Sequence, residues 1–142
     1  MKKPTPEYIK FPRASRKHGE VKLPSGVVPE KEELETAQIF TKLGYDVKFV
    51  KPNRTPGARN ADVEIAGVVY EIKCPDGNGK RTIEKQFHRA SKQSRNLILN
   101  SNYSKMEYEK FYRDTQREIS KRRNLGKILL INRGEKVLDL RK

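Results

Sequence analysis

Two carboxylates and a lysine lie within one short stretch of this sequence, where they could act on a phosphate ester. Asp62 begins a strand-like run, and Glu71 and Lys73 end the following run. If the two runs pair as a hairpin, the ends that hold these residues lie side by side, with Glu71 and Lys73 on one face of their strand. Both faces of that strand are largely apolar, and a buried acid is costly unless it is paired or used. The pattern therefore predicts a chemical site.

The residue types in this stretch suit a divalent metal ion. Two carboxylates supply oxygen ligands for Mg²⁺ or Mn²⁺, and the backbone carbonyl of Ile72 is a further candidate ligand. Lys73 beside such an ion could orient the attacking water and stabilise negative charge at phosphorus. We thus expect metal-assisted hydrolysis of a phosphodiester, with Asp62, Glu71 and Ile72 holding the metal. The alternative is structural: Asp62 would cap its strand, and Glu71 would pair with Lys73 on a solvated edge.

The chain has 142 residues and a large excess of positive charge, which favours a polyanionic partner. Its 32 Lys and Arg residues outnumber its 18 Asp and Glu residues, so the formal net charge is +14. Nucleic-acid phosphates are the usual counterpart of such a charge, whereas a solvated basic surface without a partner is the alternative. We expect no membrane binding, because no basic segment has an apolar face with Trp or Phe anchors and no apolar run is long enough to span a bilayer.

Several polar residues around the predicted site are candidates for contacts with nucleic acid. Lys80 and Arg81 precede a predicted basic helix, whose first backbone N–H groups could add to a phosphate site. Arg54 lies in a Pro-flanked loop before Asp62 and could reach a phosphate from the rim. The predicted helix and its end add three further candidates: Gln86, Arg89 and Arg95.

The cysteine count excludes both a disulfide framework and a zinc finger. Cys74 is the single cysteine, and only His18 and His88 could join it as metal ligands. We expect Cys74 to pack against the core, since no histidine is placed to act as the base for a thiolate nucleophile.

Helices and strands alternate along the part of the chain that must position these residues. Apolar periodicity and turn signals predict helices over residues 30–43, 82–94 and 104–123. They predict strands over residues 45–50, 61–66, 68–73, 96–100, 127–132 and 136–140. The order α-β-β-β-α-β-α-β-β favours one α/β domain over residues 30–142, with a mixed central sheet flanked by helices. Residues 1–29, rich in Pro and basic residues and without periodicity, are expected to form a mobile or loosely draped arm.

The spacing of Asp62, Glu71 and Lys73 resembles the core of the PD-(D/E)xK nuclease superfamily, although Asn60 and Ala61 stand where that motif has its proline. Residues of about 45 to 100 resemble, more closely, the C-terminal tRNase domains of CdiA-type contact-dependent growth inhibition toxins. The resemblance implies a restriction-endonuclease-like core. It also implies a catalytic set made of Glu35, Asp62, Glu71 and Lys73, although Glu32 and Glu33 share the first turns of the same helix.

The resemblance further implies a tRNase toxin domain that uses Mg²⁺ or Mn²⁺. It would act in the cytoplasm of the target cell, after delivery within a larger secreted, phage or mobile-element protein. An acidic immunity protein would cover its basic cleft. Two alternatives stay open: a DNA endonuclease of the same fold, and a non-catalytic nucleic-acid-binding module that uses the basic helix.

Overall fold

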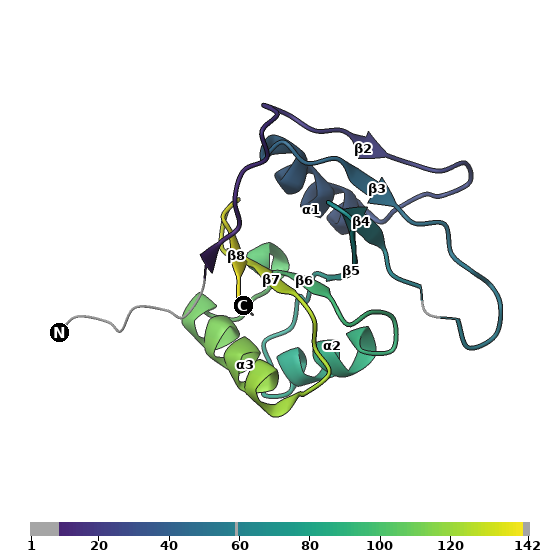
Figure 1. Cartoon of the computed structure of the whole chain (residues 1–142). Helices are drawn as coiled ribbons and strands as arrows, with labels where there is room; N and C mark the ends of the chain where they lie inside the picture. The colour runs from purple at the N-terminus through teal and green to yellow at the C-terminus, as the bar shows by residue number, and fades with distance from the viewer. Residues whose placement is uncertain (1–8, 59, 141–142) are drawn as a thin grey trace.

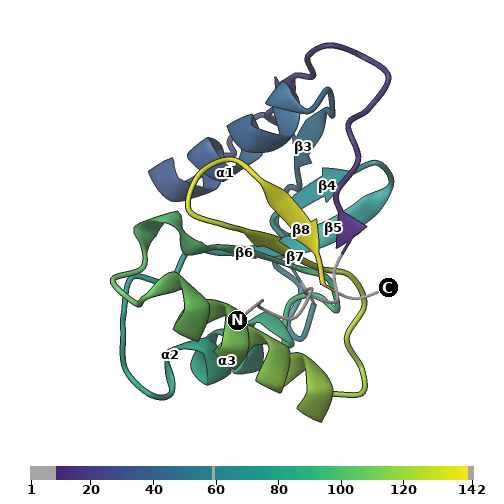
Figure 2. The same cartoon turned by 90° about the vertical axis from the view of Figure 1, so that its left-hand side faces the viewer.

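An eight-stranded mixed sheet separates one helix on one face from two helices on the other (Figures 1 and 2). The structure is a computed structural model, which describes residues 9–58 and 60–140. The elements in chain order are β1 (Ile9–Lys10), β2 (Val21–Lys22), α1 (Lys31–Lys42), β3 (Val47–Phe49), β4 (Val63–Ile65), β5 (Val68–Lys73), α2 (Thr82–Ala90), β6 (Leu97–Asn100), the 3₁₀ turn η1 (Ser101–Tyr103), α3 (Tyr108–Lys121), β7 (Ile128–Ile131) and β8 (Val137–Asp139). The strand order across the sheet is β1-β8-β7-β6-β5-β4-β3-β2. Strands β5, β6 and β7 run parallel to one another, as do β2 and β3, and the other neighbours are antiparallel.

The predicted α/β fold with a mixed sheet is confirmed, and the three predicted helices and six predicted strands follow one another in the predicted order. The parallel centre of the sheet explains the continuous apolar runs, because such strands are buried on both faces. All four residues of β6 are buried: Ile98 faces α1, whereas Leu97 and Leu99 face α2 and α3. Two hydrophobic cores therefore lie on opposite sides of the sheet. None of the helices within the described ranges is long and apolar enough to cross a membrane.

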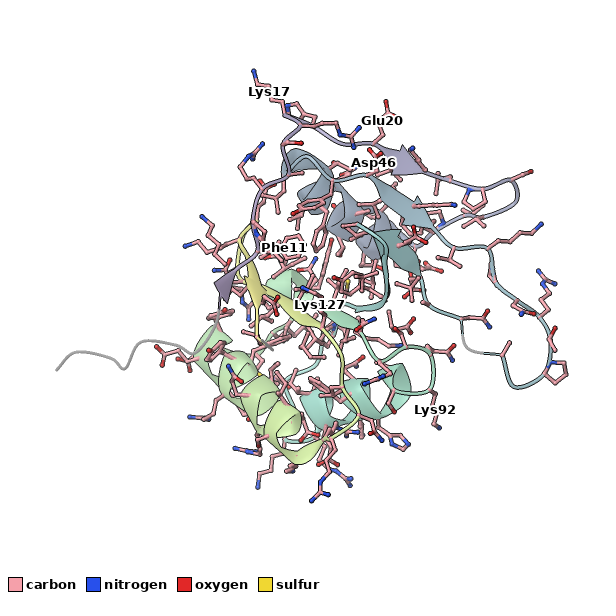
Figure 3. All side chains as sticks on the ribbon, in the orientation of Figure 1. Phe11, Lys17, Glu20, Asp46, Lys92 and Lys127 are labelled. Atoms are coloured by element: carbon pink, nitrogen blue, oxygen red, sulfur yellow. The ribbon has the colours of Figure 1, made fainter. Side chains whose placement is uncertain are left out.

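The N-terminal segment supplies both edges of the sheet over its described residues, which the expectation of a loose arm did not anticipate. Strand β1 pairs with β8, and β2 pairs with β3. Phe11 is buried, and its ring packs edge-on against Phe40. Asp46 accepts a hydrogen bond from the Glu20 backbone N–H at 3.0 Å. Figure 3 labels Glu20, Asp46 and Phe11. A strand of two residues is too short to show an alternating pattern of apolar and polar residues, so these strands leave no sign in the sequence. Residues 1–8, which also belong to the predicted arm, lie outside the described residues.

A two-residue turn fixes the register of the hairpin formed by β4 and β5. Ala66 and Gly67 both have positive φ, of 51° and 81°, which is the backbone of a type I′ turn. The turn sets Ile65 opposite Val68 and Val63 opposite Tyr70. Continued by one residue, the same register brings position 62 opposite position 71, so the turn aligns the two predicted carboxylates.

Candidate active site

Asp62 lies immediately before β4 and is held by the backbone of β5. Its N–H donates to the Tyr70 carbonyl at 2.9 Å, and its Oδ2 accepts from the Ile72 N–H at 2.7 Å. The N–H and C=O of one residue in a strand point to the same edge, so the Ile72 carbonyl points to the side of the strand on which Asp62 lies. The structure thus brings together two of the three groups predicted to hold a metal.

Glu71 is the most buried acid of the site, with 6% of its surface exposed. Its Oε2 lies 3.3 Å from Lys73 Nζ, and both residues share the sheet face of Leu97 and Leu99. Its Oε1 is buried and has no hydrogen-bond partner among the described residues. A buried carboxylate oxygen without a partner is costly, and a group that binds there would compensate it.

Burial and crowding shift the protonation of Asp62. Burial and, after it, the adjacent Glu71 carboxyl together raise the pKa of Asp62 to about 7, while the hydrogen bond from the Ile72 N–H and the charge of Lys73 act in the opposite direction. One proton, or one cation, therefore relieves the repulsion between the two carboxyl groups near neutral pH.

Glu33, rather than Glu35, is the α1 acid that the structure brings to Asp62. Glu33 is half-buried, and burial is the main cause of its raised pKa, with the neighbouring Asp62 carboxyl adding to the effect. Its Oε1 also accepts from the Glu30 N–H at 2.9 Å in a capping box that begins the helix. Glu35 is exposed and accepts a hydrogen bond from the Tyr103 hydroxyl. The structure therefore does not join Glu35 to the strand-end carboxylates.

The reason for this difference is the rotation of α1 against the sheet. Its buried positions are Thr36, Ala37, Ile39 and Phe40. Glu33 precedes Ala37 by four residues and Phe40 by seven, so it shares the buried side of the helix. Glu35 lies at the margin of that side, and its predicted catalytic role stays a prediction.

The residues present fit a divalent cation without forming a complete cage. Within residues 9–58 and 60–140, no three His, Cys, Asp or Glu side chains converge as a ready-made metal site. Mg²⁺ commonly takes only one or two carboxylates and completes its shell with water and substrate phosphate. The unpartnered Glu71 Oε1, the Asp62 carboxylate and the Ile72 carbonyl would supply such a partial shell.

Three of the six residues predicted to contact nucleic acid line two separate grooves. Arg54 is exposed and lines a groove that Asp62 also lines. Arg81 and Arg89 line a second groove, between α2 and α3, and Arg81 pairs with Glu84 at 2.6 Å. Lys80 is exposed and Gln86 is half-buried, whereas the Arg95 Nε donates to the Asn124 carbonyl at 3.1 Å. Contact with nucleic acid stays a prediction for all six.

Two polar contacts near the site were not predicted. The Asn60 N–H donates to the Gln93 Oε1 at 2.8 Å, which ties the loop before β4 to the end of α2. Asn100, at the end of β6, donates from Nδ2 to the Thr36 Oγ1 at 2.8 Å within the buried interior. In the sequence, these contacts could be suspected only from the polar residue types, an Asn at a strand end and a Gln at the end of a helix. The two residues of each contact are more than thirty residues apart in the chain, so their pairing could not be predicted.

Cys74 packs against the core next to α1, as predicted. Its Sγ lies 3.5 Å from the Thr36 Oγ1. Burial raises the pKa of the Cys74 thiol to about 11. A thiolate nucleophile at neutral pH is therefore not available from this residue.

Comparison with known proteins gives two matches. Residues 59–137 match the family model of the contact-dependent growth inhibition CdiA C-terminal domain, which covers more than half of the chain, including the strand-end acids and the lysine. The fold resembles a solved structure described as the CdiA-CT/CdiI toxin and immunity complex from Burkholderia pseudomallei. The TM-score is 0.65 at 20% sequence identity, and the match covers 87% of this chain and 100% of the other. No curated protein matches the sequence. At this identity the structural match supports the fold.

Proposed function

The chain belongs to the CdiA C-terminal domain family of contact-dependent growth inhibition, and from this membership we propose that it is a toxin domain that hydrolyses phosphodiesters with a divalent metal ion. The observation that carries the proposal is the unpartnered, buried Oε1 of Glu71 next to Asp62. A surface meant only to bind phosphates gains nothing from two acids there, because each acid repels the phosphate unless a cation intervenes.

Asp62, Glu71 and the Ile72 carbonyl would hold the ion. When bound, the ion supplies a Lewis acid that polarises the phosphoryl oxygen and lowers the pKa of bound water. Lys73, whose Nζ lies 3.3 Å from Glu71 Oε2, would donate a hydrogen bond to the attacking water and balance charge at phosphorus. The Ile72 N–H fixes the Asp62 carboxylate, so the first ligand is positioned before substrate arrives.

We favour tRNA as the substrate on the strength of the sequence resemblance. A DNA endonuclease of the same fold is the second candidate, because phosphates alone do not distinguish the two polymers. The net charge of +14 supports either polymer. We also propose an acidic immunity protein as partner; in support, the similar Burkholderia structure is described as a toxin and immunity complex. Delivery within a larger secreted protein and action in the target cytoplasm complete the proposal.

Cleavage assays on total tRNA and on plasmid DNA test this function directly. Wild type, Asp62→Asn and Glu71→Gln are compared in Mg²⁺, in Mn²⁺ and in EDTA. Glu64→Gln is the matched control, because Glu64 is half-buried on the same strand but pairs with Val69, away from the carboxylate pair. We expect discrete tRNA fragments from wild type and Glu64→Gln in metal, and a loss of at least a hundredfold in both site variants.

The other outcomes are equally informative. Nicked plasmid with intact tRNA would establish the DNA enzyme instead. Cleavage that persists in EDTA would refute the metal-assisted mechanism. Absence of cleavage of either polymer, with salt-sensitive binding retained in Asp62→Asn, would leave a non-catalytic binding module.

A further inference from the structure

A groove of about 480 Å³ opens beside the carboxylate pair, and its apolar walls have no part in the proposed mechanism. One wall is the segment between β2 and α1, with Val27, Val28 and Pro29. The other wall is the end of β3, with Phe49, and the chain after it, with Pro52. Figure 1 shows these two segments following β2 and β3 on the same side of the molecule. Asp62 and Glu33 also line the groove, so it is continuous with the candidate metal site.

The groove has the chemistry of a site for a nucleobase rather than for a phosphate. Its side walls are mostly apolar, and its acids, Glu33 and Asp62, would repel an unshielded phosphate. A nucleobase is uncharged and has apolar faces with polar edges. Two exposed cations, Lys51 and Arg54, line the groove and could hold a phosphate of the same strand.

The first wall is fixed by its own hydrogen bonds before any ligand binds. The Val27 N–H donates to the Pro24 carbonyl at 3.1 Å, in a turn that Gly26 permits with φ of 81°. Glu30 and Glu33 then close the capping box that begins α1. A fixed wall lowers the ordering cost of binding.

The second wall is held in the same way. The Asn53 N–H donates to the Asn60 Oδ1 at 2.7 Å, and the Thr55 N–H donates to the Asn53 Oδ1 at 3.0 Å. Gln93 then anchors Asn60 from the other side. The two walls are therefore pre-organised around the groove.

Val28 is the residue that most clearly lacks a partner on this surface. It is 90% exposed, although it is a large apolar side chain on a wall of the groove. Leu23 is also exposed in the same segment but does not line the groove. A planar base in the groove would cover Val28 and leave Leu23 in solvent.

We propose that this groove holds the unpaired nucleobase of the nucleotide next to the cleaved phosphate, and so contributes to the choice of cleavage position. The inference rests on the proposed nuclease function. A base that is stacked in a duplex cannot enter the groove, so the substrate must present this nucleotide in a loop, a bulge or a single-stranded end.

The test replaces one nucleotide at a time by an abasic unit in an oligonucleotide that spans the mapped cleavage position. Wild type is compared with the double variant Val28→Ser/Pro52→Ser, which removes apolar surface from both walls, and with the matched control Leu23→Ser. All three altered side chains are exposed or lie at a loop surface, and thermal melting verifies the fold of each variant.

We expect one abasic position, adjacent to the cleaved bond, to lower kcat/KM of wild type by about fivefold to tenfold, the lower range of base-stacking effects. The double variant should show a kcat/KM on the unmodified substrate that is lower than that of wild type by a similar factor. The abasic unit at that position should lower its kcat/KM little further. Leu23→Ser should behave as wild type. Pairing the same nucleotide with a complementary strand should reduce wild-type cleavage at least as much.

Three results would overturn the inference. Equal abasic sensitivity in wild type and in the double variant would show that the base does not use this groove, while the proposed function stood. Unchanged cleavage by the double variant would assign the groove to another partner, such as an immunity protein. Failure of wild type to cleave the unmodified substrate would refute the proposed function, and the inference that depends on it.

Discussion

At the scale of single residues, the unusual feature is a pair of acids that the protein itself only partly satisfies. Asp62 receives one backbone hydrogen bond, and Glu71 receives a lysine on one oxygen and nothing on the other among the described residues. Structural acids in proteins are normally hydrogen-bonded throughout. Among the described residues, this incomplete set of partners is therefore a sign of function.

The raised pKa of Asp62 predicts a pH dependence of stability in the absence of metal. The folded pKa of about 7 exceeds the unfolded value near 3.8, so the contribution of this group to stability is complete below about pH 4 and is lost as the pH rises through 7. Melting temperatures measured in EDTA between pH 5 and 8 should fall more steeply for wild type than for Asp62→Asn. Parallel profiles would contradict the assignment.

A second residue-scale prediction concerns the thiol of Cys74. With a pKa of about 11 it carries about a hundredfold less thiolate at pH 8 than an unperturbed cysteine. Its alkylation by iodoacetamide in the folded protein should be slower by at least that factor. Alkylation in 6 M guanidinium is the control, and equal rates in the two conditions would show that the thiol is neither buried nor shifted.

At the scale of elements, the β4–β5 hairpin positions the site, because one two-residue turn sets the register of both acids. A register shift by one residue would move Asp62 to the opposite face of the sheet. Ala66 adopts φ of 51° at this turn, a conformation that costs an L-residue free energy.

Replacement of Ala66 by Asn should therefore stabilise the protein. Asn tolerates the left-handed backbone, and Asn-Gly is the preferred type I′ pair. We expect the free energy of unfolding in urea to rise by about 0.5–1 kcal/mol, with cleavage activity unchanged. Ala58→Asn, in the loop after β3, is the control, and an equal gain there would argue against a turn-specific effect.

Much of this arrangement could be predicted from the sequence. The parts that could not be predicted have one cause in common. The hairpin and the three helices follow from local periodicity and turn residues. Strands β1 and β2 are two residues long, and they exist only through pairing with β8 and β3, which are distant in sequence. The choice between Glu33 and Glu35 likewise depends on how α1 rotates against the sheet, since both acids lie in its first turns.

At the scale of the whole molecule, positive charge is distributed over several surfaces rather than in one tail. The groove between α2 and α3 alone contains Arg81, Lys85, Arg89, Lys121 and Arg122 against Glu84 and Glu118. Figure 3 shows Lys92 projecting outward beyond α2 and Lys17 projecting at the opposite end of the molecule. A long polyanion could therefore contact the protein beyond the candidate active site.

Binding of nucleic acid should depend on salt accordingly. Measured with Asp62→Asn to prevent cleavage, the logarithm of the affinity should fall linearly with the logarithm of the salt concentration. Arg89→Ala should reduce that slope by about 1, the value for one lost phosphate contact. Lys17→Ala should leave the slope unchanged, and equal effects of the two substitutions would show that binding is diffuse.

The hairpin also has a consequence for the order in which the chain folds. Both acids and the lysine lie within one hairpin, and isolated hairpins close in about 1–10 μs. The groove beside them needs β2 to pair with β3, twenty-six residues apart at Val21 and Val47, and such distant contacts form more slowly. We expect a refolding chain to bring its two acids together early, within the hairpin, and to form the walls of the groove later.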